Sequence, residues 1–347
     1  MKIEAVDLFY LSMPKVLDIG DGSQDALLVR VTADGYVGWG EAEASPLTSI
    51  ASWIAPMSHS ACHPVIDSVL GEPLNSPEDI FAITRKVRAN SFYAIIQSDL
   101  TLSGIEIALW DLLGQVKEEP IYKLLGYKEA TRKLPYASVL FGDTVEETLK
   151  KASDIRKVGF SAIKFGWGHF GRGSVQDDAD HIHAAREGIG ADAHLMIDAG
   201  TIFHEDVEAA AARLQALSDA NVLWYEEPFD AAALASYGEL SKRTPKVKLA
   251  GGEGAHNPYQ AEHLIDHGGV GFVQIDTGYI GGIGDAYRVA QYAKTRGVQF
   301  VNHTFTSHSA LSASLQPFAG LKDSWITEYP MEPKSLCVEL TVDKIEV

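Results

Sequence analysis

From about Lys133 onward the chain alternates short apolar runs with amphipathic helical runs, and this alternation constrains the fold most strongly. Eight of the runs are typical of buried strands: LPYASVLF, SAIKF, AHLMID, NVLWYEE, VKLAGGE, GFVQID, VQFVNH and SWITEY. Between them lie segments such as TVEETLKKASDIRKVG and GDAYRVAQYAKTRG, whose apolar residues recur at helical spacing. Strands that alternate with helices pair in parallel, and eight such units close a (β/α)₈ barrel.

The first 125 residues follow a different pattern. KIEAVDLFYL and DALLVRVTADGYVGWGEAEA alternate like strands, with a hairpin turn at ADGY, and SPEDIFAITRKVRAN opens like a helix with a Ser cap and a Pro. We therefore predict an α/β protein: a modified (β/α)₈ TIM barrel over residues 126–330 and an α+β domain over 1–125. The final segment, 331–347, is expected to return to the N-terminal domain and complete it.

Composition narrows the class of partner. The net charge of −18 argues against binding to nucleic acid or to an anionic membrane. The N-terminus reads as an alternating strand rather than a signal peptide, and no apolar run reaches membrane-spanning length. The two cysteines, Cys62 and Cys337, form neither a metal-binding spacing nor a disulfide framework. We expect a soluble, cytoplasmic enzyme that acts on a small molecule.

Polar side chains stand at the ends of seven predicted barrel strands, 23 to 34 residues apart. They are Lys164, Asp198, Glu226, Glu253, Asp276, His303 and Glu328. Because the carboxyl ends of barrel strands converge on one mouth, we expect these side chains to share a pocket.

Three of these residues are acids on adjacent predicted strands: Asp198, Glu226 and Glu253. Bare carboxylates this close would repel one another, and a hard divalent cation with oxygen ligands relieves the repulsion. Mg²⁺ suits such a site because it needs few protein ligands and leaves positions for substrate. A single acid here would be an ordinary solvated loop residue, but three in barrel register favour a metal site. For Glu227 two interpretations stay open: it holds a lysine behind the site, or it points into the next loop.

Asp276 and His303 end consecutive strands and should be neighbours. A carboxylate bonded to one imidazole nitrogen raises the basicity of the other, so we predict His303 as a general base or acid rather than a satisfied core histidine. Lys164, across the mouth, would act as a base, polarise a bound carboxylate or form a structural salt bridge. Glu328 would donate to a developing oxyanion if protonated, or position a neighbour.

These motifs resemble one known group of proteins. AIKFGWG, LMIDAG, WYEEPF, LAGGEGAHNP, VQIDTGYIGGIGDAYRVA, VNHT and TEYP together are similar to the enolase superfamily, in its mandelate racemase-like subgroup. YVGWGEAEASP and GIEIALWDLLGQVKEEPIYKLLG resemble the capping domain of that family. The resemblance covers essentially the whole chain.

The resemblance implies metal-assisted removal of the proton α to a carboxylate. The substrate carboxylate would bind Mg²⁺, and the metal with Lys164 and Glu328 would stabilise the enolate. If a hydroxyl stands on the β-carbon, His303 would protonate it and expel water, turning an aldonic or aldaric acid sugar into a 2-keto-3-deoxy acid. The resemblance also implies a homo-oligomer.

The chain departs from the family pattern at strand two, where relatives carry Lys-x-Lys. The second lysine is replaced by Gly166, and Gly200 stands where many relatives have Asn. Racemisation normally needs a base on each side of the substrate, whereas dehydration needs one well-placed His. We therefore expect an acid-sugar dehydratase, with a racemase, epimerase or cycloisomerase as the alternative. Trp167 and His169 follow Gly166, and we expect one or the other to fill that side; His169 would alternatively supply the second base.

Substrate specificity is expected to come from loops of the capping domain, as the resemblance implies. The candidates are KVLDIGDGSQ, which includes Asp18 and Gly20, and ASPLTSIASWIAP. Gly20 and Gly22 favour a lid that excludes water, and a plain connecting loop is the alternative.

Three other functions fit less well. A metal-dependent amidohydrolase wants His-x-His at the end of strand one, but His181 and His183 lie in a predicted helix, where we expect surface residues. A retaining glycosidase needs two opposed carboxylates without a three-acid cluster. A non-catalytic barrel used as a binding protein would not need the acids together with Lys164 and His303.

Overall fold

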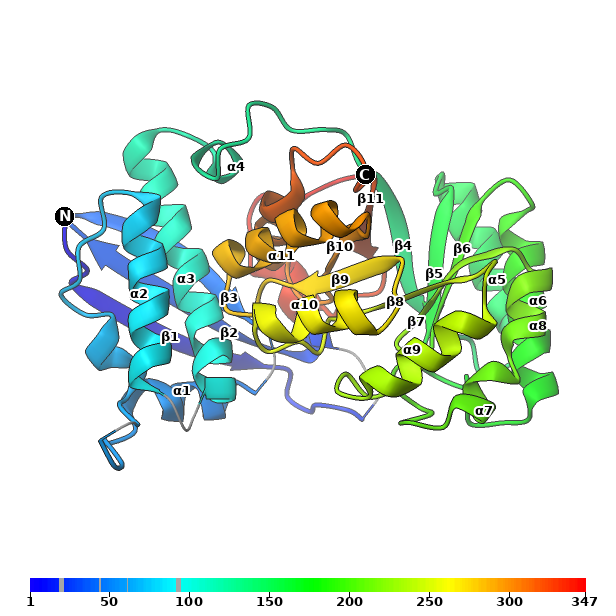
Figure 1. Ribbon diagram of the computed structural model, residues 1–347. Coiled ribbons are helices and arrows are strands. Elements are labelled where there is room, and N and C mark those ends of the chain that lie inside the picture. The colour runs from blue at the N-terminus through cyan, green and yellow to red at the C-terminus, as the bar shows by residue number, and fades with distance from the viewer. Residues whose placement is uncertain (19–21, 44, 61, 92–94) are drawn as a thin grey trace.

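The computed structural model describes residues 1–18, 22–43, 45–60, 62–91 and 95–347 (Figure 1). Its larger sheet is parallel, with the strand order β10-β9-β8-β7-β6-β5-β4-β11. The strands are β4 (Leu134–Leu140), β5 (Ala162–Gly166), β6 (His194–Asp198), β7 (Val222–Glu226), β8 (Lys248–Gly251), β9 (Phe272–Asp276), β10 (Gln299–His303) and β11 (Ile326–Pro330). All eight predicted strands are confirmed, and they form a nearly closed barrel.

Helices cover the outside of this barrel, as the alternation predicts. They are α5 (Val145–Val158), α6 (Val175–Ile189), α7 (Val207–Ala211), α8 (Leu214–Asp219), α9 (Leu234–Arg243), α10 (Pro258–His267), α11 (Ile283–Arg296) and α12 (His308–Leu315). Thr144 caps α5 by accepting a hydrogen bond from Glu147 N, and Ser174 caps α6 in the same way. The segment HEDVEAAAARLQALSDA forms two short helices, α7 and α8.

The seam between β10 and β11 is joined by side chains. Asn302 Oδ1 accepts hydrogen bonds from Thr327 Oγ1 at 2.7 Å and from Glu328 N at 2.9 Å. Glu328 Oε2 in turn accepts from Thr304 N at 2.7 Å. These bonds hold the end of β11 beside the end of β10, which places Glu328 next to His303.

The N-terminal domain is an antiparallel sheet covered by helices. Its strands are β1 (Ala5–Ser12), β2 (Asp25–Ala33) and β3 (Tyr36–Ala42), and its helices are α1 (Pro46–Ile54), α2 (Pro77–Asn90), α3 (Ile95–Lys117) and α4 (Ile121–Leu124). The predicted ADGY hairpin is present, with Asp34 and Gly35 at positive φ. A Cβ on Gly40 would lie 2.0 Å from the carbonyl oxygen of Gly104, so glycine lets α3 rest directly on β3.

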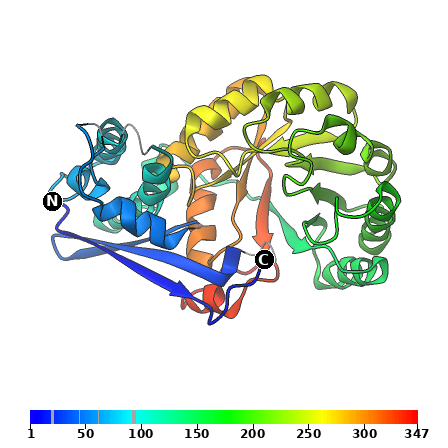
Figure 2. The same ribbon diagram turned by 90° about the horizontal axis from the view of Figure 1, so that it is seen from below.

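Two buried contacts tie the N-terminal domain to α11 of the barrel. The carboxylate of Glu106, on α3, accepts hydrogen bonds from Ile283 N at 2.7 Å and Gly284 N at 2.9 Å, and so caps α11. Arg88, on α2, forms an ion pair with Asp285 in the first turn of the same helix. In Figures 1 and 2 the N-terminal elements therefore lie beside α10 and α11, with β5–β7 and α5–α8 at the far end.

The C-terminal segment returns to the N-terminal domain. It contains α13 (Ser335–Glu339), and Lys334 N donates to Ser23 Oγ at 2.7 Å. The Cys337 thiol lies 3.2 Å from Ser23 O. Across the described residues, no helix is both long and apolar enough to cross a membrane.

Candidate active site

A layer of apolar side chains forms the floor beneath the mouth of the barrel. Each strand contributes one residue to it: Tyr136, Ala162, Met196, Trp224, Ala250, Phe272, Val301 and Ile326. Successive side chains of a strand point to opposite faces, so the residue two positions further on also points inward. This rule places Lys164, Asp198, Glu226, His303 and Glu328 above the floor.

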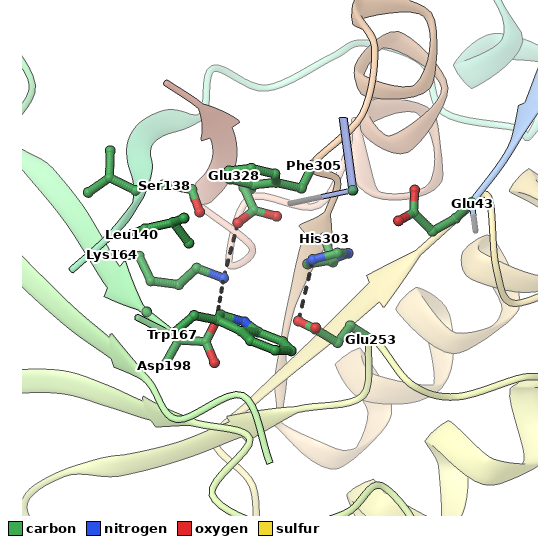
Figure 3. Close-up of a pocket in the computed structure, with 13 residues that line it drawn as sticks. Glu43, Ser138, Leu140, Lys164, Trp167, Asp198, Glu253, His303, Phe305 and Glu328 are labelled. Atoms are coloured by element: carbon green, nitrogen blue, oxygen red, sulfur yellow. Dashed lines mark ion pairs between the residues drawn. The ribbon is translucent and has the colours of Figure 1, made fainter. Parts of the chain in front are cut away.

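These residues meet at a cavity of about 170 Å³. Its wall includes Lys164, Asp198, Glu253, His303 and Glu328, together with Gly22, Glu43, Ser138, Val139, Leu140, Gly166, Trp167 and Phe305 (Figure 3). The structure thus brings together residues from both domains. Glu226 and Asp276 lie directly behind the wall, in contact with Lys164 and His303 respectively.

Lys164 lies among three carboxylates and is itself buried. Its ammonium pairs with Glu226, with Glu328 Oε1 at 3.1 Å and with Asp198 Oδ2 at 3.4 Å. Burial alone would lower the pKa of Lys164, but Glu226 and Glu328 outweigh it and hold this pKa well above its usual value. Lys164 is therefore a cation in this arrangement, placed to stabilise negative charge rather than to accept a proton.

The predicted metal ligands surround the same region. Burial raises the pKa of Glu226 well above its usual value, offset in part by Lys164, and burial also raises the pKa of Glu253. Glu253 Oε2 is buried without a hydrogen-bond partner among the described residues. Among the described residues, no three His, Cys, Asp or Glu side chains already stand around a common point. The ammonium of Lys164 pairs with both Asp198 and Glu226.

This donor set fits a hard cation. Asp198, Glu226 and Glu253 offer carboxylate oxygens from neighbouring strands, with too few cations to balance them, and Mg²⁺ prefers oxygen ligands. Glu227 does not join this set. It lies buried behind the cavity, where its Oε1 accepts a hydrogen bond from Gly252 N at 3.2 Å. Of the two interpretations left open for Glu227, the structure favours the one in which it points into the next loop.

His303 and Asp276 form the predicted pair. His303 Nδ1 lies 2.8 Å from Asp276 Oδ2, and Asp276 Oδ1 also accepts from Gly278 N at 2.7 Å. This leaves His303 Nε2 facing the cavity, 3.5 Å from Glu253 Oε2. Burial would lower the pKa of His303, but Glu253 and the other nearby carboxylates raise it well above its usual value. The geometry suits proton transfer at Nε2.

Glu328 is a carboxylate that positions its neighbours. Burial would raise the pKa of Glu328, but Lys164 and His303 outweigh it, so the pKa lies below its usual range. A protonated Glu328 that donates to an oxyanion is therefore disfavoured. The alternative, in which Glu328 orients Lys164, agrees with the 3.1 Å ion pair.

The side of the cavity away from His303 is covered by an aromatic ring. A Cβ on Gly200 would lie 2.7 Å from the indole of Trp167, and a Cβ on Gly166 would lie 2.9 Å from Asp198 Oδ2. Trp167 has a positive φ of 54° and lines the cavity. Of the two glycines that depart from the family pattern, Gly200 thus makes room for Trp167 and Gly166 makes room for Asp198. No lysine side chain fits at position 166 without displacing Asp198.

The other predicted substrate-binding residues lie elsewhere. The ring of His169 stacks on that of His181 at 5.2 Å and does not line the cavity, so it offers no second base there. Asp18 is exposed and is also not part of the wall, while Gly20 lies outside the described residues. Our expectation that His181 is a surface residue was wrong: it is buried, and its Nδ1 lies 2.8 Å from Thr148 Oγ1.

Sequence reasoning missed Glu43, which enters the cavity from the N-terminal domain. The signal was present in GWGEAEAS, where Glu41 and Glu43 alternate at the end of a strand and so share one face. The repeat of polar residues at strand ends concerns the barrel strands, so it does not point to a residue of the N-terminal domain.

Family models match most of the chain. Residues 11–126 match the N-terminal domain of the mandelate racemase/muconate lactonizing enzyme family, and residues 147–347 match the enolase C-terminal domain-like family. The chain belongs to the enolase superfamily. Within it, these two matches identify a mandelate racemase-like member and cover both the N-terminal domain and the barrel.

Named relatives of this superfamily member differ in their reactions. D-galactarolactone cycloisomerase of Agrobacterium fabrum is 29% identical over 88% of this chain and 78% of its own length. D-galactonate dehydratase of Xanthomonas oryzae pv. oryzae is 30% identical over 83% of this chain and 74% of its own length. The crystal structure of a predicted mandelate racemase from Rhodobacter sphaeroides superposes with a TM-score of 0.94 at 59% identity, covering 99% of this chain and 88% of that one.

Proposed function

We propose that this protein is a Mg²⁺-dependent dehydratase of acid sugars. It would remove the proton α to the carboxylate of an aldonic or aldaric acid and eliminate the β-hydroxyl as water. The product would be a 2-keto-3-deoxy acid. Similarity to D-galactonate dehydratase supports the substrate class.

One observation carries the choice of reaction. Among the described residues that line the cavity, the one histidine is His303, with its carboxylate partner behind it, and Trp167 covers another side. Racemisation requires proton transfer on both faces of the α-carbon, but Trp167 has no group that transfers protons. Dehydration needs only one such group, which first accepts a proton and then returns it.

The chain's own residues account for each proton. With His303 in its neutral form, the C2–H bond breaks and its proton moves to Nε2, while Asp276 accepts the hydrogen bond from Nδ1–H and stabilises the imidazolium that forms. The electron pair becomes an enolate, whose negative charge Lys164 offsets. The pair then forms the C2=C3 bond as the C3–O bond breaks, and the proton from His303 leaves with the hydroxyl as water. The resulting enol tautomerises to the keto acid.

Asp198, Glu226 and Glu253 would hold the metal ion. When bound, it supplies the positive charge that acidifies the α-carbon and neutralises the carboxylate and enolate oxygens. Glu328 keeps the Lys164 ammonium directed toward the same oxygens.

A second candidate is cycloisomerisation, which similarity to D-galactarolactone cycloisomerase favours. It is compatible with a single base, because the enolate can expel an oxygen of the substrate ring in place of hydroxide. The two reactions differ in what leaves: dehydration releases water, whereas cycloisomerisation keeps every atom of the substrate.

The test uses the purified protein with Mg²⁺ and a panel of aldonic acids, aldaric acids and their lactones in D₂O. We expect keto-acid formation from at least one free acid sugar, reduced at least 100-fold by His303→Asn because no second histidine lines the cavity in the part of the chain that the structure describes. His183→Asn is the matched control, since His183 is exposed on α6. Deuterium entering C2 of recovered acid without keto acid would argue for reversible proton transfer instead. Isomerised lactone without loss of water would argue for cycloisomerisation.

A further inference from the structure

Glu43 is held in place by a contact between the two domains. It follows β3, and its backbone N–H donates to Gly278 O at 2.9 Å, in the loop after β9. The contact is tight, since a Cβ on Gly278 would lie only 3.3 Å from Glu43 Cβ. Asp276 ends β9 directly before this loop, so one short segment of the barrel positions both Glu43 and the partner of His303.

The carboxyl group of Glu43 points into the cavity toward His303 (Figure 3). Gly22 leaves room for it, because a Cβ there would come within 2.9 Å of Glu43 Oε1. Among the described residues no hydrogen bond or ion pair engages this carboxyl group. Burial and the charge of Asp276 hold the pKa of Glu43 well above its usual value, because further negative charge is unfavourable at this end of the cavity.

The charges on the cavity wall are unbalanced. Among the described residues that line it, the cationic or protonatable bases are Lys164 and His303, against the carboxyl groups of Glu43, Asp198, Glu253 and Glu328. Lys164 is already shared by three carboxylates. The eight residues outside the described ranges include no Lys, Arg or His.

This imbalance bears on the number of carboxylates a substrate can carry. One substrate carboxylate has a place beside the metal ligands and Lys164. A second carboxylate, at the other end of a sugar chain, would find no cation on the wall and would meet Glu43. A hydroxylated end would instead find a partner, since a carboxyl group bonds hydroxyls well in a site shielded from water.

We propose that Glu43 is a specificity-determining residue that bonds the hydroxylated tail of the substrate and restricts it to monocarboxylic acid sugars. Aldonic acids are accepted and the corresponding aldaric acids are rejected. This inference rests on the proposed function, in that it assumes an acid-sugar ligand, and it narrows the substrate class from two kinds of acid to one.

The test measures binding without turnover. His303→Asn protein, loaded with Mg²⁺, is titrated calorimetrically with pairs that differ only at the terminal carbon: D-galactonate against galactarate, and D-gluconate against glucarate. We expect the aldonate of at least one pair to bind 10-fold or more tightly than its aldarate. In this His303→Asn background, adding Glu43→Ala should lower the affinity for that aldonate about 10-fold. Adding Glu43→Gln should instead reduce the ratio of aldonate affinity to aldarate affinity at least 5-fold, mainly because the aldarate binds more tightly. Glu78→Gln, an exposed acid on α2, is the control.

The outcomes separate this inference from the proposed reaction. Equal or tighter binding of both aldarates, or an unchanged ratio in folded Glu43 variants, overturns the role of Glu43 and leaves dehydration standing. Glu43-dependent preference for aldonates with no keto acid from the wild-type protein supports the role and overturns dehydration. Failure of every acid sugar to bind overturns both.

Discussion

Replacing Lys164 by methionine should lower the stability of the protein, because the carboxylates around Lys164 would lose the cation that they share. Methionine keeps the length of the side chain and removes its charge, which leaves Asp198, Glu226 and Glu328 without their common partner. The side chain of Lys164 is 4% exposed and those of its partners 0 to 6%, so solvent screens these pairs little. Removing one partner of a buried ion pair costs about 3–5 kcal/mol.

The loss translates into a measurable shift in melting temperature. With roughly 2.1 cal/mol/K of unfolding entropy per residue, a chain of 347 residues loses about 1.4 °C per kcal/mol, so Tm should fall by about 4–7 °C in a metal chelator. A divalent cation relieves the same repulsion, so added Mg²⁺ should raise the Tm of Lys164→Met more than that of the wild type.

The assay is differential scanning fluorimetry in EDTA and in Mg²⁺. Lys150→Met is the control, because Lys150 is 78% exposed and pairs with Asp154 at the surface. The reasoning is refuted if Lys164→Met melts within about 1 °C of this control in EDTA. If Mg²⁺ raises the Tm of the wild type and of Lys164→Met equally, the idea that Mg²⁺ and the Lys164 ammonium relieve the same repulsion is refuted.

Two further predictions concern single positions near the cavity. Burial raises the pKa of Glu41 to about 7, and its Oε1 has no hydrogen-bond partner among the described residues. Because this folded-state pKa lies above the unfolded value, the stability that Glu41 contributes is complete below about pH 4.5 and is lost as the pH rises through about 7. Glu41→Gln should therefore be about 1–3 kcal/mol more stable than wild type at pH 8 and nearly equal at pH 5; an equal gap in Tm at both pH values would contradict this. Gly166→Lys should not create a racemase, because its Cβ would press on Asp198. We expect the variant to lose about 1–3 kcal/mol of stability and to bind Mg²⁺ more weakly, as measured by calorimetry. NMR should detect no C2 epimer of the substrate, and formation of that epimer would contradict the prediction.

The barrel and most of its site follow from local pattern. On every strand except β8, the apolar residue on the inner face is followed two positions later by a polar one, as in Ala162 and Lys164 or Met196 and Asp198. That spacing belongs to the geometry of a strand and survives in the sequence. Because parallel strands must carry these pairs to one rim, placing them together needs no knowledge of side-chain packing.

Local pattern does not extend to contacts between distant segments. His169 and Trp167 are two residues apart, yet only Trp167 reaches the cavity, because the missing side chain of Gly200 leaves space for its ring. His181 was misjudged for a similar reason, since its partner Thr148 lies on another helix, α5.

The sequence by itself determined the strand–helix repeat, the acids and base at the strand ends and the glycine at position 166, because each is a matter of residue type and spacing. Only the tertiary structure decided that Lys164 is shared by three carboxylates and that Trp167 closes one side of the cavity. It also decided that Glu43 enters from the other domain. These features depend on which groups approach across the fold, and that is set by the docking of Glu43 on Gly278 and by the space left at Gly166 and Gly200.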